Sequence, residues 1–221
     1  MKLNRRSVLG AIGLVGVGTG AAFGSGAFTS TTAERAVEVN VFGAVDADTG
    51  TVQNPDQEEQ DNTAESITNT AVDVLVDTAS DTVTVRDQQD DIVDGTDLFP
   101  IADEESDVTL PTGYDELSGS FVSLVANDVT IVFGEPDNNE LPPNSRIDYD
   151  DLFDFVENQG EDEFNVTFEG DGELLTEIGG DEVSEDAEFT VGDDGPKNGI
   201  VETGTESRET ENLDIRIEPS G

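Results

Sequence analysis

The 221-residue sequence contains no cysteine, no histidine and no tryptophan, and only two tyrosines. Without cysteine, neither a disulfide framework nor a thiolate metal site can form. Without histidine as well, the side chains of catalytic triads and of most zinc-dependent hydrolases are missing. Adjacent carboxylates such as Asp150 and Asp151, or Asp193 and Asp194, occur by composition alone in so acidic a chain, and a glycosidase would also need aromatic platforms for sugar. We therefore expect a protein that is not an enzyme.

Basic residues are scarce: nine Lys and Arg stand against 52 Asp and Glu, for a net charge of −43. Like charges repel over about 30 Å in dilute buffer but only about 3 Å in molar salt. The composition therefore predicts a protein that works in concentrated brine. The alternative is a disordered acidic tail, but Leu, Ile, Val and Phe make up about a quarter of the chain, which favours a globular domain. So few cations also exclude a nucleic-acid binder.

Three of the nine cations, Lys2, Arg5 and Arg6, lie in the first six residues. A Gly- and Ala-rich apolar stretch follows over residues 8–23, and small residues at 24–27 offer a cleavage site. Arg5-Arg6 followed by Ser7-Val8-Leu9 resembles the twin-arginine export motif. We expect residues 1–27 to be a signal peptide, with contact to the membrane only during export and a final location outside the cell or on its surface. The alternative is a leader that stays as a membrane anchor, although its glycine-interrupted apolar stretch is short for a span.

Apolar residues recur with a period of two along residues 28–221, and clusters of Gly, Asp and Asn separate these runs. The pattern predicts an all-β domain: a single antiparallel sandwich or jelly roll of about 8–10 short strands with long acidic loops. The expected strands lie at residues 37–41, 72–76, 83–85, 121–125, 129–133, 164–168, 189–191 and 213–217.

No segment predicts a helix of ten residues with a clear apolar face. The nearest case is residues 149–158, where Leu152, Phe153 and Val156 have the spacing of one or two short helical turns. Residues 54–66 are polar and acidic, and we expect a loop there.

Two stretches resemble a known family. Residues 26–35, GAFTSTTAER, are similar to the junction that follows the leader in exported surface proteins of halophilic archaea. Residues 144–160, which include Leu152-Phe153 and Asn158, resemble an element of the TasA/camelysin-like fibre proteins and their archaeal bundling-pilin relatives. The resemblance implies a secreted jelly-roll subunit of an extracellular fibre or biofilm matrix. It also implies a homopolymer formed by donor-strand exchange, in which the N-terminal strand of each copy completes the sheet of its neighbour.

Residues 28–42 have the properties that a donor strand needs: no proline and one alternating apolar face. Phe28, Val37, Val39 and Val41 are the candidate anchoring side chains. The same pattern is expected of a strand that simply opens its own sheet, so both interpretations stay open. A fibre subunit therefore competes with a monomeric cell-surface module that binds calcium, glycan or the surface layer.

Calcium is the most plausible ligand, and no other cofactor is expected. Asp46 and Asp48 offer two carboxylates within the turn at residues 46–50, but no complete twelve-residue calcium loop is present. Solvated acidic turns explain the same residues. Asn165-Val166-Thr167 matches the acceptor pattern for N-glycosylation, although it lies inside an expected strand.

Overall fold

The structure is a computed structural model that describes residues 34–42, 52–87, 89–101, 109–115, 117, 121–134, 141–160, 163–192, 195–205 and 208–220. Residues 33–221 form one compact unit, and all described residues belong to it. Several residues named in the sequence analysis lie outside the described ones. They are the expected signal peptide at residues 1–27 with Arg5 and Arg6, the candidate anchor Phe28, and the candidate calcium ligands Asp46 and Asp48.

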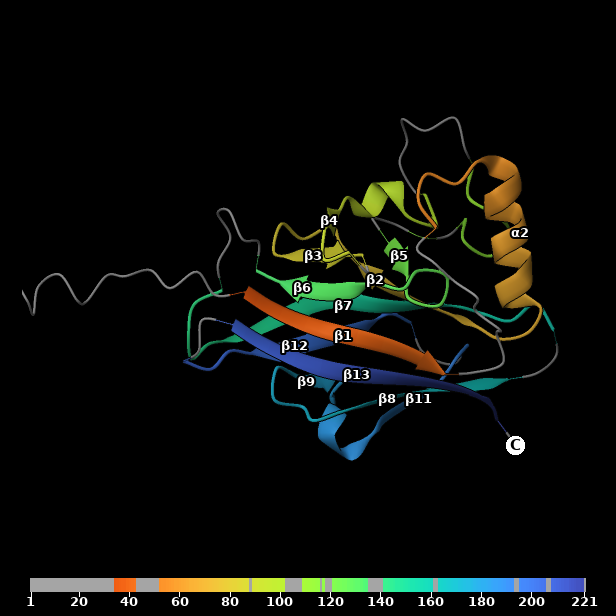
Figure 1. The fold of residues 1–221 in the computed structure, drawn as a ribbon. Coiled ribbons are helices and arrows are strands. Elements are labelled where there is room, and N and C mark those ends of the chain that lie inside the picture. The colour runs from red at the N-terminus through yellow and green to blue at the C-terminus, as the bar shows by residue number, and fades with distance from the viewer. Residues whose placement is uncertain are drawn as a thin grey trace, which may run out of the picture. The chain divides into compact units, whose positions relative to one another are not determined.

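Two β-sheets make up the described domain (Figure 1). The seven-stranded sheet has the order β11-β8-β13-β1-β6-β3-β4, and the six-stranded sheet has the order β10-β9-β12-β7-β2-β5. Their strands are β1 (Glu34–Phe42), β2 (Asp73–Asp77), β3 (Val83–Arg86), β4 (Ile92–Val93), β5 (Phe121–Ser123), β6 (Thr130–Phe133), β7 (Arg146–Val156), β8 (Phe164–Gly170), β9 (Leu175–Ile178), β10 (Asp181–Glu182), β11 (Ala187–Thr190), β12 (Lys197–Glu202) and β13 (Arg208–Pro219). Two 3₁₀ turns, η1 (Gly95–Asp97) and η2 (Val183–Glu185), complete the set with one α-helix.

The predicted all-β sandwich is confirmed, and each of the eight expected strands overlaps an observed one. The described residues hold thirteen strands rather than 8–10. One pair also departs from the antiparallel expectation, because β1 runs parallel to β13. Alternation builds the core as expected: Phe164, Val166 and Phe168 on β8 are buried, and the ring of Phe168 lies 5.1 Å from that of Phe153 on β7.

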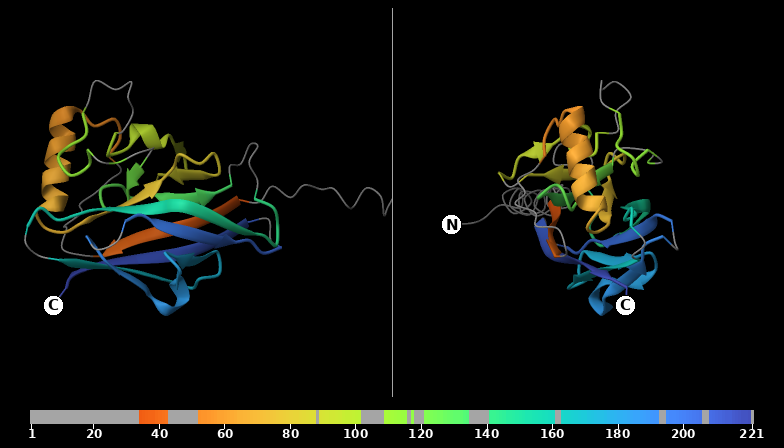
Figure 2. Two further views of the ribbon diagram at one scale, coloured as in Figure 1. Left: turned by 180° about the vertical axis from the view of Figure 1, so that it is seen from behind. Right: turned by 90° about the vertical axis from the view of Figure 1, so that its right-hand side faces the viewer.

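The prediction of a loop at residues 54–66 is wrong, because α2 (Gln57–Thr68) covers most of this range. Asp56 and Glu59 form a reciprocal capping box at the first turn, which satisfies backbone N–H groups that a helix start leaves open. The buried stripe has helical spacing but consists of Gln60, Ala64, Ile67 and Thr68, so only two of its four residues are apolar and the sequence shows no clear apolar face. The helix lies at one end of the domain (Figures 1 and 2).

The prediction of helical turns within residues 149–158 is also wrong, since β7 covers residues 149–156. The pairing of β7 with β12 shifts between Lys197 and Gly199, and Asp151 has a positive φ of 52°. Such a bulge adds residues on one strand and resets which side chains face the core. Leu152, Phe153 and Val156 are all buried as a result. Their spacing resembles a helix only because the bulge interrupts the period of two.

Candidate assembly site

The first strand, β1, is an internal strand of the seven-stranded sheet and is paired on both edges (Figure 1). Its nine residues pair in parallel with β13, from Glu34 opposite Arg208 to Phe42 opposite Arg216. On the other edge, four residues pair antiparallel with β6. The strand is therefore paired along its whole length on the β13 edge and over four residues on the β6 edge, an arrangement that suits either an intrachain first strand or a donated strand.

The position of β1 marks a boundary between two parts of the chain. On one side of it lie β6, β3 and β4, which come from residues 83–133; on the other lie β13, β8 and β11, which come from residues 164–219. In the six-stranded sheet the corresponding boundary is closed directly, because β2 pairs with β7. Only the seven-stranded sheet needs β1 to join its two parts.

Among the predicted anchors on β1, Val37 is fully buried and Val39 is half-buried. Val37 lies opposite Ile131 on β6 and Glu211 on β13, so it occupies the middle of the site. Val41 is in register with Ile215, but the structure does not describe the Val41 side chain. Glu38 is exposed, as the alternation of a strand requires.

The edge of β13 that receives β1 contains a buried carboxylate that the sequence analysis missed. Glu211 is 7% exposed and accepts hydrogen bonds from the backbone N–H groups of Gly172, Leu174 (2.7 Å) and Leu175 (3.0 Å). These bonds satisfy the carboxylate without a cation and tie the segment between β8 and β9 to β13. No local pattern distinguishes Glu211 from the exposed acids around it.

A cavity of about 900 Å³ beside the β2–β7 pair forms an acidic groove. Its described lining has no Lys or Arg. Its carboxylates are Asp77, Asp115, Asp150, Asp151, Asp154 and Glu157, and its apolar residues include Leu117, Phe121 and Phe155. Burial raises the pKa of Asp77 and of Asp154 above the ordinary value, and the charge of Asp151 raises both further. The groove therefore concentrates negative charge without a described counter-charge.

The β2–β7 pair itself contains a fully buried acid, Asp73, which is the first residue of β2. Its two oxygens accept hydrogen bonds from Tyr114 Oη (2.8 Å) and Ser123 Oγ (2.7 Å). Burial raises the pKa of Asp73 to about 7, and these hydrogen bonds, with those from the backbone of Val74 and Val125, act in the opposite direction. The side chain joins the 109–117 segment and β5 to the six-stranded sheet.

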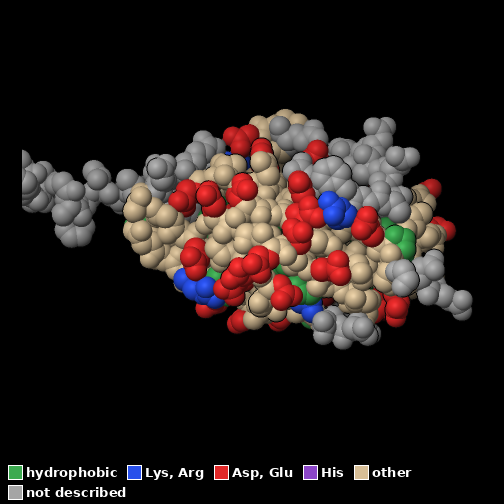
Figure 3. All heavy atoms as spheres, turned by 90° about the horizontal axis from the view of Figure 1, so that it is seen from below, with side chains coloured by type: hydrophobic (Ala, Val, Ile, Leu, Met, Phe, Trp, Pro, Cys, Tyr) green, Lys and Arg blue, Asp and Glu red, His purple; other side chains and the backbone are tan. Residues whose placement is uncertain are grey.

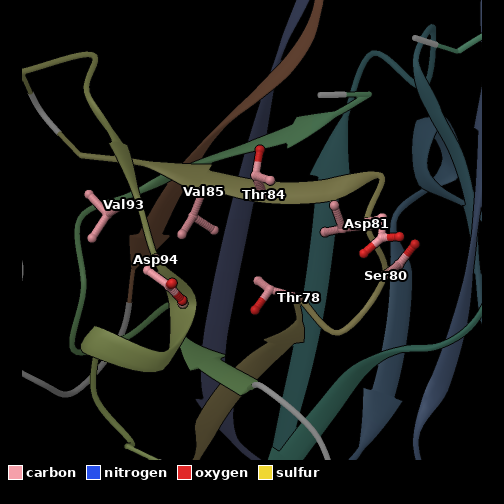
Figure 4. Close-up of a pocket in the computed structure, with 9 residues that line it drawn as sticks. Thr78, Ser80, Asp81, Thr84, Val85, Val93 and Asp94 are labelled. Carbon is pink, nitrogen blue, oxygen red and sulfur yellow. The ribbon is translucent and has the colours of Figure 1, made fainter. Parts of the chain in front are cut away.

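A smaller cavity of about 260 Å³ is lined by hydroxyl and carboxyl groups from β3, β4 and the adjoining turns (Figure 4). Asp94 caps the η1 turn by accepting from Thr96, and Ser80 shares a 3.0 Å hydrogen bond with Thr82. Asp94 and Ser80 thus serve turn geometry, whereas the buried Oγ1 of Thr84 has no hydrogen-bond partner among the described residues. The described lining contains no Lys, Arg or His.

The outer surface is acidic over the face seen in Figure 3, with few Lys and Arg side chains and only small hydrophobic areas. Within the described part of the chain, Ile92 is the only large hydrophobic side chain that is exposed. One of the few cations, Arg216, forms a 2.6 Å ion pair with Glu169 across β13 and β8. Such a surface is typical of a protein that relies on salt to screen its own charge.

The remaining sequence candidates are a metal site and a glycosylation site, and of their residues only Asn165 lies among those that the structure describes. No group of three or more Asp and Glu with metal-binding geometry occurs among the described residues. Asn165 lies on β8, half-buried, where its Oδ1 accepts from Thr190 Oγ1 at 3.0 Å. Within the same residues, no helix has the length and apolar character needed to cross a membrane.

A comparison with models of protein families found no matching family, and comparisons with curated proteins and with solved structures found no similar protein.

Proposed function

We propose that this protein is an exported, non-catalytic structural subunit of an extracellular fibre or matrix, and that β1 of one copy completes the seven-stranded sheet of the next. The observation that supports the proposal most directly is the position of β1. It is the first strand of the described chain, yet it lies between two strands from distant parts of that chain. A strand supplied by a second copy would make the same two ladders.

The contacts of β1 favour strand exchange on energetic grounds as well. Removing β1 would leave the facing edges of β13 and β6 unpaired and would expose the core around Val37. Unpaired edges of this kind recruit another strand. Burying one valine contributes about 1.5–3 kcal/mol, and the backbone ladder adds to it. An empty site would therefore bind a matching strand from a neighbour.

The direct test places one cysteine on each side of the β1–β13 pair. Glu38 and Asn212 are opposite in register and both exposed, and the native chain has no cysteine. The Glu38→Cys/Asn212→Cys protein is assembled in about 3 M salt, where charges are screened, and treated with a short bis-maleimide. We expect a ladder of covalent multimers on a denaturing gel.

The control is Glu38→Cys alone, which can form no species larger than a covalent dimer. A double variant that gives only an internally crosslinked monomer would contradict strand exchange. That outcome would support the second candidate, a monomeric cell-surface module that binds calcium, glycan or the surface layer. The acidic groove favours this second candidate through its charge alone, since its described carboxylates form no metal-binding group in the structure.

A further inference from the structure

The β1–β13 register places two opposite-charge pairs side by side at its start. Glu34 is opposite Arg208, and Arg35 is opposite Glu209. Cations are rare in this chain: after residue 6 there are only six, and Arg35 and Arg208 are two of them. Two scarce cations therefore fall at adjacent positions of one strand pair, and each has an acid as its partner across the ladder.

Every small shift of the register breaks this arrangement. Moving β1 by one residue along β13 places Glu34 opposite Glu209, and moving it the other way places Arg35 opposite Arg208. Like charges directly opposite each other destabilise a strand pair. A one-residue shift also turns the buried face of β1 toward solvent, so hydrophobic alternation opposes the same error.

Two-residue shifts are the harder errors to exclude, because they keep Val37 and Val39 on the same face. One of them brings Glu34 opposite Glu206, and the other brings Glu38 opposite Asp214. Both also lose the two opposite-charge pairs, although the shift that brings Glu38 opposite Asp214 places Arg35 opposite Glu211. The carboxylate of Glu211 already accepts three backbone N–H groups, so this new pair does not replace the two that are lost.

One member of the pattern is held in place by the fold. The carboxylate of Glu209 accepts the backbone N–H of Gly204 at 3.0 and 3.2 Å. In molar salt, charges further apart than about 3 Å are screened, so the overall charge of −43 contributes little to choosing a partner. Charges at directly opposite positions of a strand pair are therefore the ones that can still affect pairing under those conditions.

We propose that Glu34, Arg35, Arg208 and Glu209 set the register of β1 in the sheet and select the β1 of a second copy of this chain as its partner. The selection of a second copy rests on the proposed strand exchange. The register role applies to the β1–β13 pair whichever copy supplies β1.

Pairs of charge-reversal variants, made in the full-length protein, test this inference. Arg35→Glu brings two carboxylates together at the 35/209 position, and Glu209→Arg brings two guanidinium groups together there. We expect each variant alone to raise the critical concentration for filaments in about 3 M salt roughly tenfold, from the cost of like-charge strand pairs. An equal mixture restores an opposite pair at every junction when the variants alternate, so its critical concentration returns to within about twofold of the wild-type value.

Glu38→Arg is the matched control, because it changes the charge as Glu209→Arg does but faces Asn212 and Thr130, which are uncharged. It should assemble like the wild type. Since Glu209→Arg also removes the bond to Gly204, the same design is repeated with Glu34→Arg and Arg208→Glu. Single variants of both pairs that assemble like the wild type, or mixtures no better than their components, would overturn the inference.

Wild-type protein that forms no filaments overturns the proposed exchange instead. The register role is then read from thermal unfolding of the single variants and of the Arg35→Glu/Glu209→Arg double variant. The double variant should regain most of the lost stability, and strictly additive losses would refute the register role.

Discussion

The two sheets join the two parts of the chain in different ways. In the six-stranded sheet β2 pairs directly with β7, from Asp73 opposite Val156 to Val76 opposite Phe153. In the seven-stranded sheet β6 and β13 do not meet, and β1 lies between them. One junction is made by strands well inside the chain, whereas the other depends on the first strand.

The two junctions also differ in their charge. The β2–β7 junction is flanked by the acidic groove, whose described lining has no cation, and by the buried Asp73. The β1–β13 junction begins with two acid–base pairs in register. The direct junction thus lies beside clustered negative charge, while the β1 junction has opposite charges in register, which the proposed register role uses.

Salt removal should have the largest effect on stability, and the two junctions should respond to it differently. Below about 0.3 M salt, repulsion acts over longer distances, so we expect the whole fold to be lost. During the titration, amide exchange in β2 and β7 should accelerate before exchange in β1 and β13, because the groove acids lie beside β7. Hydrogen-exchange mass spectrometry at stepwise lower salt measures both.

Asp151→Asn sharpens the salt experiment, since Asp151 raises the pKa of both Asp77 and Asp154 and asparagine tolerates its positive φ. It should shift the unfolding midpoint to lower salt. Asp148→Asn, a neighbour that contacts Arg146 at 3.8 Å, should not. A fold that persists unchanged in dilute buffer would refute the brine interpretation.

The second prediction concerns pH and the direct junction. The pKa of Asp73 is raised from 3.8 to about 7 in the folded state, so the native protein holds a proton that the unfolded chain releases. Stability should therefore fall as pH rises from about 4 to above 7, by up to about 4 kcal/mol from this group. Asp73→Asn should remove that part of the slope in denaturant unfolding between pH 4 and 8.

Asp115→Asn is the control for this measurement, because Asp115 is an exposed acid of the same 109–117 segment. It should keep the wild-type slope. A slope that is equally steep in Asp73→Asn would show that Asp73 does not titrate in this range.

The smallest effect comes from a matched pair of substitutions, Val37→Ala on β1 and Val74→Ala on β2. Both valines are 0% exposed, so each change should cost about 2 kcal/mol. If β1 is donated, Val37→Ala weakens filaments in a manner that depends on protein concentration, whereas Val74→Ala lowers the melting temperature of the domain itself. Identical, concentration-independent losses from both would contradict the difference between the junctions.

The sequence analysis succeeded where residues report on their own surroundings. Alternation located eight strands because a side chain's face in a strand depends only on its position. It failed at α2, whose buried stripe includes Gln60, although the capping box at Asp56 and Glu59 was a readable signal. It failed at β7 because a bulge at Asp151 disturbs the period, and it missed the buried Glu211 and Asp73 because an acid's burial depends on distant donors.

The sequence by itself determined the class of fold and the excess of negative charge, because strand alternation is local and net charge is a sum over residues. Only the tertiary structure decided that β1 lies parallel to β13, that Glu34 and Arg35 lie in register with Arg208 and Glu209, and that six acids gather at one groove. The β1–β13 features join opposite ends of the described chain, and the groove joins acids from residues 77 to 157. Such proximity is set by the packing of the whole sandwich, which no local pattern of residues encodes.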